Sequence, residues 1–91
     1  MKAIKRPTME EPYMPEQIEL EGKYVNNFQI GYNAFEFLFD FGQGYGELEA
    51  PRIHTRVITA PAYAVVLSNM LGESIHQYEK KFGAIPKMAE R

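Results

Sequence analysis

Residues 35–41 read Phe-Glu-Phe-Leu-Phe-Asp-Phe, and this stretch decides the fold of the chain. Side chains alternate between the two faces of a β-strand, so a repeat of two predicts a strand with one aromatic face. Aromatic residues also suit a pleated, half-buried surface. We therefore predict a strand with one face formed by Phe35, Phe37, Phe39 and Phe41.

The same alternation occurs on both sides of this stretch. Residues 24–32 place Tyr24, Asn26, Phe28, Ile30 and Tyr32 on one face, and Asn33-Ala34 predicts a tight turn into the next strand. Gly42, Gly44 and Gly46 then indicate a loop that runs to Pro51, and residues 52–59 form a third strand. Residues 18–21 are short enough to add only a small fourth strand.

A long helix is predicted over residues 61–82. Proline suits the first turn of a helix, Thr59 is the expected N-cap, and Gly83 with Pro86 ends the helix. Gly72 in its middle indicates either close approach of another backbone or local tolerance. Apolar residues recur at helical spacing in one broad stripe: Tyr63, Val66, Leu67, Met70, Leu71, Ile75, Tyr78 and Phe82.

These elements predict an α+β fold. A small antiparallel sheet of three to four strands is followed by one long C-terminal amphipathic helix, which we expect to pack on one face of the sheet. Residues 1–17, which contain three prolines, are expected to form an extended or disordered arm. Residues 18–85 form the single domain, and residues 86–91 are a tail.

Size and composition narrow the classes of function. The chain has 91 residues, no cysteine and a formal net charge of −2. Disulfides and thiolate metal sites are excluded, and a general nucleic-acid binder would need a basic surface. The longest apolar run, residues 62–67, is too short for a membrane span, so we expect a soluble, cytoplasmic protein. A chain this short is marginal alone, which favours a homodimer or a higher homo-oligomer.

The aromatic content points to a surface for association. Phe and Tyr make up 12 of the 91 residues, more than one helix is expected to cover on a three-stranded sheet. A second copy of the chain is the simplest cover, and a groove for an extended apolar protein client is the alternative. The residues expected to form this surface are Phe28, Tyr32, Phe35, Phe37, Phe39, Leu71, Ile75 and Tyr78.

A polar patch is predicted on the third strand, where Arg52, His54 and Arg56 share one face. One interpretation is a site for a small anion. The favoured interpretation is a cross-strand salt ladder, with Asp40 opposite Arg52 and Glu36 opposite Arg56. We find no pattern of residues that indicates a catalytic, cofactor or metal site, and therefore expect an interaction or structural module that is not an enzyme.

Several short motifs resemble one family in their order and spacing. They are the hexapeptide at residues 27–32, Glu36-Phe37 through Asp40-Phe41-Gly42, the run at residues 52–59 followed by Pro61, and the segments at residues 77–79 and 82–85. Together they resemble the prokaryotic proteins catalogued as domain of unknown function 3467. The resemblance implies no catalytic residues. A looser similarity, in topology alone, to the SecB-type export chaperones suggests oligomeric binding of extended polypeptide.

Overall fold

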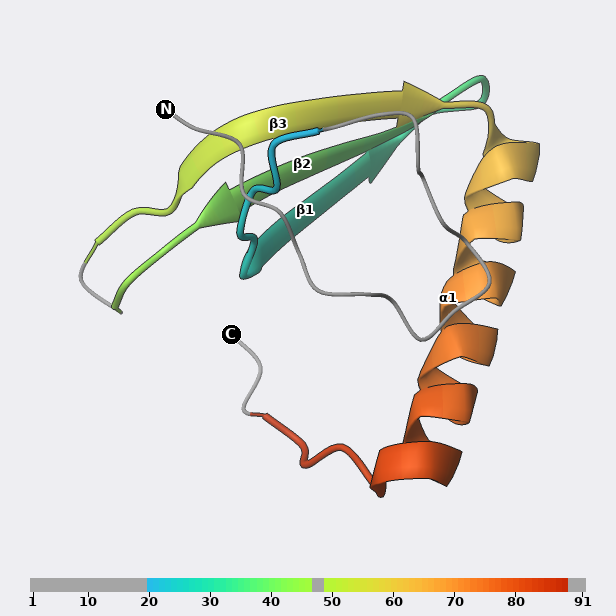
Figure 1. The fold of residues 1–91 in the computed structure, drawn as a ribbon. Helices are drawn as coiled ribbons and strands as arrows, with labels where there is room; N and C mark the ends of the chain where they lie inside the picture. Colours follow the sequence, from blue (N-terminus) through green and yellow to red (C-terminus); the bar gives the residue numbers. More distant parts are fainter. Residues whose placement is uncertain (1–19, 47–48, 89–91) are drawn as a thin grey trace.

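The computed structural model describes residues 20–46 and 49–88. Three antiparallel strands, β1 (Asn27–Tyr32), β2 (Phe37–Gln43) and β3 (Arg52–Thr59), form one sheet with the order β1-β2-β3. The helix α1 (Pro61–Phe82) follows (Figure 1). This arrangement confirms the predicted α+β class. The predicted arm at residues 1–17 lies outside the described residues, and Leu20 and Glu21 are not part of a strand.

The connection between β1 and β2 is longer than the predicted two-residue turn. The Oδ1 atom of Asn33 accepts hydrogen bonds from the backbone N–H groups of Phe35 at 2.7 Å and Glu36 at 2.9 Å. These groups are held by the turn, so strand pairing starts only at Phe37, opposite Tyr32. The prediction that Phe35 belongs to β2 is therefore wrong. Its side chain lies in the turn and is 80% exposed.

The register of β2 and β3 differs from the expected one by four residues. Asp40 lies opposite Arg56, and Arg52 lies opposite Gln43. The sequence-based pairing assumed that β2 ends before Gly42, whereas β2 continues through Gly42 with an irregularity between Phe41 and Gly42. A Cβ atom at Gly42 would lie 2.9 Å from the carbonyl carbon of Arg52, so the close approach requires glycine.

The helix has the predicted bounds, with Pro61 in its first turn and Gly83 at its C-cap with a φ of 101°. The N-cap is Ala60, with no side-chain hydrogen bond, and not the predicted Thr59, because β3 keeps Thr59 as its last residue. Lys80 and Lys81 lie in the last turn, where positive charge favours the helix dipole.

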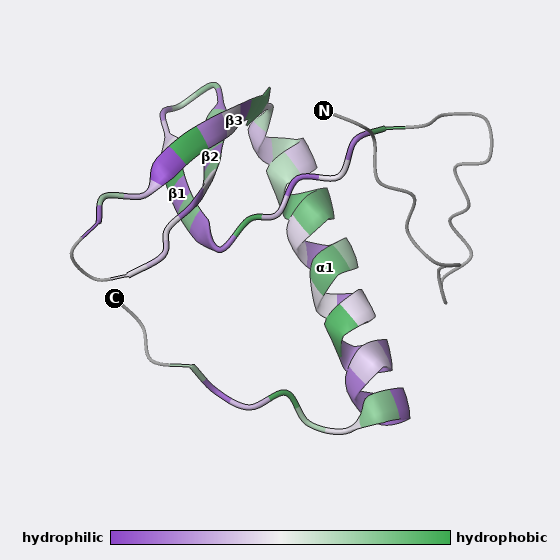
Figure 2. Ribbon diagram, turned by 60° about the vertical axis from the view of Figure 1, so that its left-hand side comes forward, coloured by the Kyte–Doolittle hydropathy of each residue, from purple (hydrophilic) through white to green (hydrophobic). Residues whose placement is uncertain are grey.

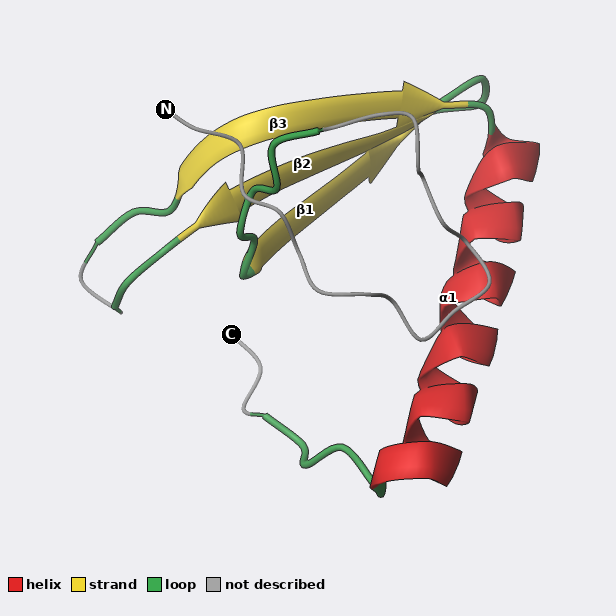
Figure 3. Cartoon of the chain, viewed as in Figure 1, coloured by secondary structure: helices red, strands yellow, loops and turns green. Residues whose placement is uncertain are grey.

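The helix does not pack on the sheet of its own chain as predicted. Figure 1 and Figure 3 show α1 turning away from the sheet at the end of β3. No extensive contact joins α1 to any of the strands, and none of its residues is buried. Ala60 alone links β3 to α1, and a link this short favours a helix that continues away from the sheet. Within the described residues the chain consequently has no buried hydrophobic side chain at all.

Candidate functional site

One face of the sheet, which we call the aromatic sheet face, is formed by apolar residues of all three strands. Pairing of β1 with β2 places Phe28 opposite Phe41, Ile30 opposite Phe39, and Tyr32 opposite Phe37. On the other side of β2, Val57 of β3 lies opposite Phe39. The aromatic sheet face therefore consists of these residues: Phe28, Ile30, Tyr32, Phe37, Phe39, Phe41 and Val57.

Ring contacts confirm that these residues share one face. The rings of Tyr32 and Phe37 stack at 5.6 Å between centroids, and Phe28 meets Phe41 edge to face at 6.0 Å. The ring of Phe39 stacks on those of Phe37 and Phe41 at 6.4 Å on each side. The rings form a continuous row along β2, which is the geometry of a preformed packing surface.

Nothing in the described chain covers this face. Phe28, Ile30 and Tyr32 on β1 are 63%, 62% and 77% exposed, and the phenylalanines of β2 are half-buried. Monomeric proteins rarely expose contiguous apolar patches of this kind, and larger patches mark interaction sites. Phe35, which was predicted to belong to this surface, is separate from it at the tip of the β1–β2 turn.

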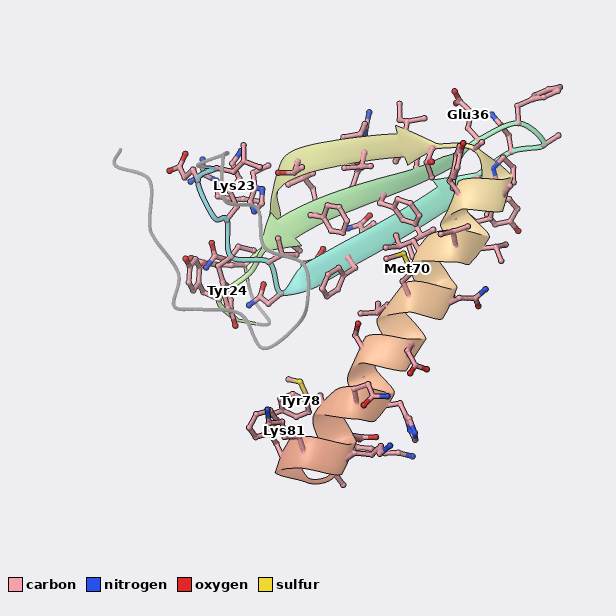
Figure 4. All side chains as sticks on the ribbon, turned by 45° about the vertical axis from the view of Figure 1, so that its right-hand side comes forward. Lys23, Tyr24, Glu36, Met70, Tyr78 and Lys81 are labelled. Atoms are coloured by element: carbon pink, nitrogen blue, oxygen red, sulfur yellow. The ribbon has the colours of Figure 1, made fainter. Side chains whose placement is uncertain are left out.

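The helix stripe is the second exposed apolar surface, and it consists of the eight residues predicted from helical spacing: Tyr63, Val66, Leu67, Met70, Leu71, Ile75, Tyr78 and Phe82. Figure 2 shows apolar residues on successive turns of α1. Met70 and Leu71 are 64% and 57% exposed. In Figure 4 the side chains of Met70 and Tyr78 extend from the same side of α1, the side on which the sheet lies in that view.

The end of the helix stripe is organised by local contacts. The rings of Tyr78 and Phe82 lie 4.9 Å apart, and the Nζ atom of Lys81 lies 5.8 Å from the centroid of the Phe82 ring. After the helix, the Glu79 carboxylate accepts a hydrogen bond from the backbone N–H of Ile85 at 3.0 Å. These contacts fix the last turn, and they leave the predicted surface residues Leu71, Ile75 and Tyr78 exposed.

The opposite face of the sheet carries an ion pair between Asp40 and Arg56. Arg56 donates two hydrogen bonds to Asp40, from Nε to Oδ1 at 2.7 Å and from Nη2 to Oδ2 at 2.8 Å. The hydrogen bonds and charge of Arg56 lower the pKa of Asp40, and Asp40 raises the pKa of Arg56 in turn. The expected pairs of Asp40 with Arg52 and Glu36 with Arg56 are wrong because of the register, and Glu36 lies in the turn (Figure 4).

His54 joins two segments that are far apart in sequence. Its Nε2 atom lies 3.2 Å from the carbonyl oxygen of Tyr24, and its Nδ1 atom lies 2.7 Å from the hydroxyl of Thr55. A carbonyl oxygen only accepts, so Nε2 carries the proton. Nε2 therefore connects the segment before β1 to β3, whereas Nδ1 bonds the neighbouring residue of the same strand. The structure gives His54 a positioning role that the sequence did not reveal.

Asn26 is a further structural residue that sequence reasoning missed. Its Nδ2 donates to the carbonyl oxygen of Gly44 at 3.0 Å, and its Oδ1 accepts from the Gly44 N–H at 2.9 Å. The side-chain amide thereby extends the β1–β2 ladder by one pair beyond Asn27. Its place in the alternating stretch indicated only a strand residue, because the partner is backbone 18 residues away.

The described part of the chain holds no cluster of three or more His, Cys, Asp or Glu residues with the spacing to bind a metal ion. Within the same residues, α1 is too polar for a helix that crosses a bilayer. The described residues also carry an ion pair on one sheet face and two exposed apolar surfaces.

Sheet, helix and exposed apolar surfaces define a small α+β protein with one antiparallel sheet and one C-terminal helix. The chain belongs to the family described as "Protein of unknown function (DUF3467)", whose model matches residues 2–87. This match confirms the resemblance seen in the sequence motifs. Neither the curated proteins nor the solved structures contain a match to the chain.

Proposed function

We propose that this protein is a self-associating interaction module without a catalytic site, in which a second copy covers the aromatic sheet face and the helix stripe. The observation that carries the proposal is that no hydrophobic side chain of the described residues is buried. Apolar burial is the dominant favourable contribution to folding. A chain with ordered strands and a 22-residue helix needs that burial from another surface.

The apolar side chains that a second copy would cover are exposed on both surfaces. Tyr32 is 77% exposed on the aromatic sheet face, and Met70 is 64% exposed on the helix stripe. Large exposed apolar patches mark interaction sites.

A second copy is the partner that best fits the two surfaces. Each copy offers the same pair of apolar faces, and a two-fold dimer uses the same patch on both subunits. The charged pair Asp40–Arg56 lies on the other face of the sheet, so covering the aromatic sheet face buries neither of these charges. Obligate homodimer interfaces are similarly apolar.

Analytical ultracentrifugation at micromolar concentration tests the proposal. We expect a dimer or a larger assembly of the 10.5 kDa chain, and a melting temperature that rises with protein concentration. A stable monomer, with a melting temperature that is constant over two decades of concentration, would overturn the proposal.

A matched pair of variants locates the interface. Leu71 and Val65 are 57% and 59% exposed in the single chain, but Val65 lies outside the helix stripe. We expect Leu71→Glu to abolish assembly because it places a charge in the interface, and Val65→Glu to keep it. Equal loss of assembly in both variants would contradict the assignment of the interface to the stripe.

Binding of an extended apolar polypeptide is the second candidate function. The observation that favours it is the continuous row of stacked rings on the aromatic sheet face, which would remain open to a client if assembly used the stripe alone. The assembled protein would then bind a hydrophobic dye and suppress aggregation of a model client. Absence of both activities would eliminate this candidate.

Binding of a small anion is the least supported alternative. Asp40 already neutralises Arg56, and His54 uses both ring nitrogens within the chain, so Arg52 alone of the predicted patch would be available to the ligand. Isothermal titration with inorganic phosphate tests it, and we expect no binding.

A further inference from the structure

We infer that α1 of one copy lies on the aromatic sheet face of the other copy, so that two chains exchange their helices. The inference rests on the proposed self-association and specifies its geometry. In this geometry the helix stripe of each copy covers the aromatic sheet face of the other. Three features of the chain support it: the link between β3 and α1, the dimensions of the two surfaces, and their chemistry.

The link between β3 and α1 favours a helix that leaves its own sheet. Strand β3 ends at Thr59, the helix begins at Pro61, and Ala60 between them is extended, with φ −72° and ψ 155°. The connections between strands and helices usually contain two to six residues. One residue therefore leaves little freedom to reverse the chain over its own sheet.

The first turn of the helix makes this link stiffer. The backbone N–H groups of Tyr63 and Ala64 both donate to the carbonyl oxygen of Ala60, at 3.0 and 3.1 Å. The ring of Pro61 fixes its own φ angle. Ala60 is thus tied to the helix on one side and follows directly from the strand on the other, and α1 leaves the end of β3 away from the sheet (Figure 1).

A helix of this size fits the sheet face of a second copy. A helix of 22 residues is about 33 Å long and about 10 Å wide at 1.5 Å per residue. Three strands span roughly 10 Å across, and eight residues of β3 extend about 26 Å at ~3.3 Å per residue. One helix laid along the strands therefore covers the full face, and each copy supplies one helix for one sheet.

The chemistry of the two surfaces is complementary. The middle of the helix stripe is aliphatic, at Val66, Leu67, Met70, Leu71 and Ile75. The aromatic sheet face is a row of rings with Ile30 and Val57 at its sides and no charged residue among its members. Aliphatic side chains and thioethers pack closely on ring faces and edges. Covering the sheet with the stripe leaves no charge of either surface unpaired.

Cysteine cross-linking tests the exchange directly because the natural chain contains no cysteine. Val57→Cys places a thiol on the sheet face, and each of Val66→Cys, Met70→Cys, Ser74→Cys and Tyr78→Cys places one along the stripe side of α1. Each helix change is combined with Val57→Cys in the full chain. The folded protein is treated with a short bis-maleimide, and the products are separated on a denaturing gel.

Helix exchange predicts a covalent dimer for at least one of the four combinations, because the two thiols that meet belong to different chains. An excess of the cysteine-free chain, refolded together with the double variant, would reduce this product severalfold. His76→Cys combined with Val57→Cys is the matched control, since His76 lies on the polar side of the helix, and we expect no cross-linked dimer from it.

Cross-linking and sedimentation together distinguish failure of the helix exchange from failure of the proposed self-association. A cross-linked monomer whose yield is unchanged by the excess of cysteine-free chain would show that the helix folds back on its own sheet, and would overturn the exchange. Absence of any Val57–stripe cross-link in a protein that sediments as a dimer would also overturn the exchange while leaving self-association in place. A monomer in sedimentation would overturn both.

Discussion

The sheet and the helix of this protein are stabilised by different interactions. The sheet is held by two antiparallel ladders, a row of stacked rings and an ion pair, all within one chain. The helix has local start and stop features, but it makes no extensive contact with the strands, and none of its residues is buried. In proteins most helical stability comes from packing an amphipathic face. If a second copy covers the helix stripe as proposed, the helix is the element whose stability depends on that assembly.

Loss of a ring from the central strand β2 is expected to have the largest effect. Phe37 stacks on both Tyr32 and Phe39, so Phe37→Ala interrupts the row on β2. Phe37 is only half-buried in the single chain, and the proposed assembly would bury it. Truncation of a buried phenylalanine costs about 3–5 kcal/mol, and small domains have only ~5–15 kcal/mol of total stability. We expect Phe37→Ala to unfold the protein and not merely to release folded monomers. Circular dichroism and sedimentation measure this, and a folded monomeric variant would contradict it.

Truncation in the helix stripe is expected to distinguish a stripe that stays exposed from one that a second copy buries. Leu71 is exposed in the single chain, and on that basis Leu71→Ala would change stability by no more than about 0.5 kcal/mol. If the stripe is buried by a second copy, the cost rises to about 2–5 kcal/mol and unfolding accompanies dissociation. We expect the larger value from chemical denaturation. Val65→Ala, on the other side of α1, is the control and is expected to change little.

A change at the glycine in the middle of the helix is expected to have a smaller effect on stability. A Cβ atom at Gly72 would meet nothing within 4 Å in the single chain. Alanine is better than glycine in a helix interior by up to about 1 kcal/mol, so we expect Gly72→Ala to raise the melting temperature. If instead Gly72→Ala destabilises the protein, then a second backbone approaches this position in the assembly, and the polar side of the helix is also an interface.

The ion pair on the polar sheet face is expected to give the smallest effect, as a dependence of stability on pH. Its partner Arg56 lowers the pKa of Asp40 below the ordinary value of 3.8. A carboxylate with a lowered folded-state pKa stabilises the fold above its unfolded pKa, and this stability is lost as pH falls through the folded pKa. Melting temperatures measured downward from about pH 5 are therefore expected to fall more steeply in the natural chain than in Asp40→Asn.

A second carboxylate serves as the control for this measurement. Glu36 lies in the β1–β2 turn and not opposite Arg56, so Glu36→Gln is expected to keep the acid dependence of the natural chain. Equal slopes in the natural chain and in Asp40→Asn would show that the ion pair does not contribute in solution.

Local sequence patterns predicted the elements but not their exact pairing. Alternation found all three strands, and Pro61 and Gly83 located both ends of the helix, because these features depend on neighbouring residues. The register of β2 and β3 was missed because it depends on the irregularity at Gly42. The alternation at Phe35 continues the strand pattern, but the hydrogen bonds to Asn33 hold Phe35 and Glu36 in the turn before β2.

The sequence by itself therefore determined the class of fold, the apolar stripe, the aromatic alternation and the family. These are properties of composition and of spacing along the chain. Only the tertiary structure decided that Asp40 pairs with Arg56, that His54 reaches the carbonyl of Tyr24, and that α1 leaves its own sheet uncovered. Each of these depends on where the chain turns, and a one-residue link at Ala60 sets the direction of a whole helix.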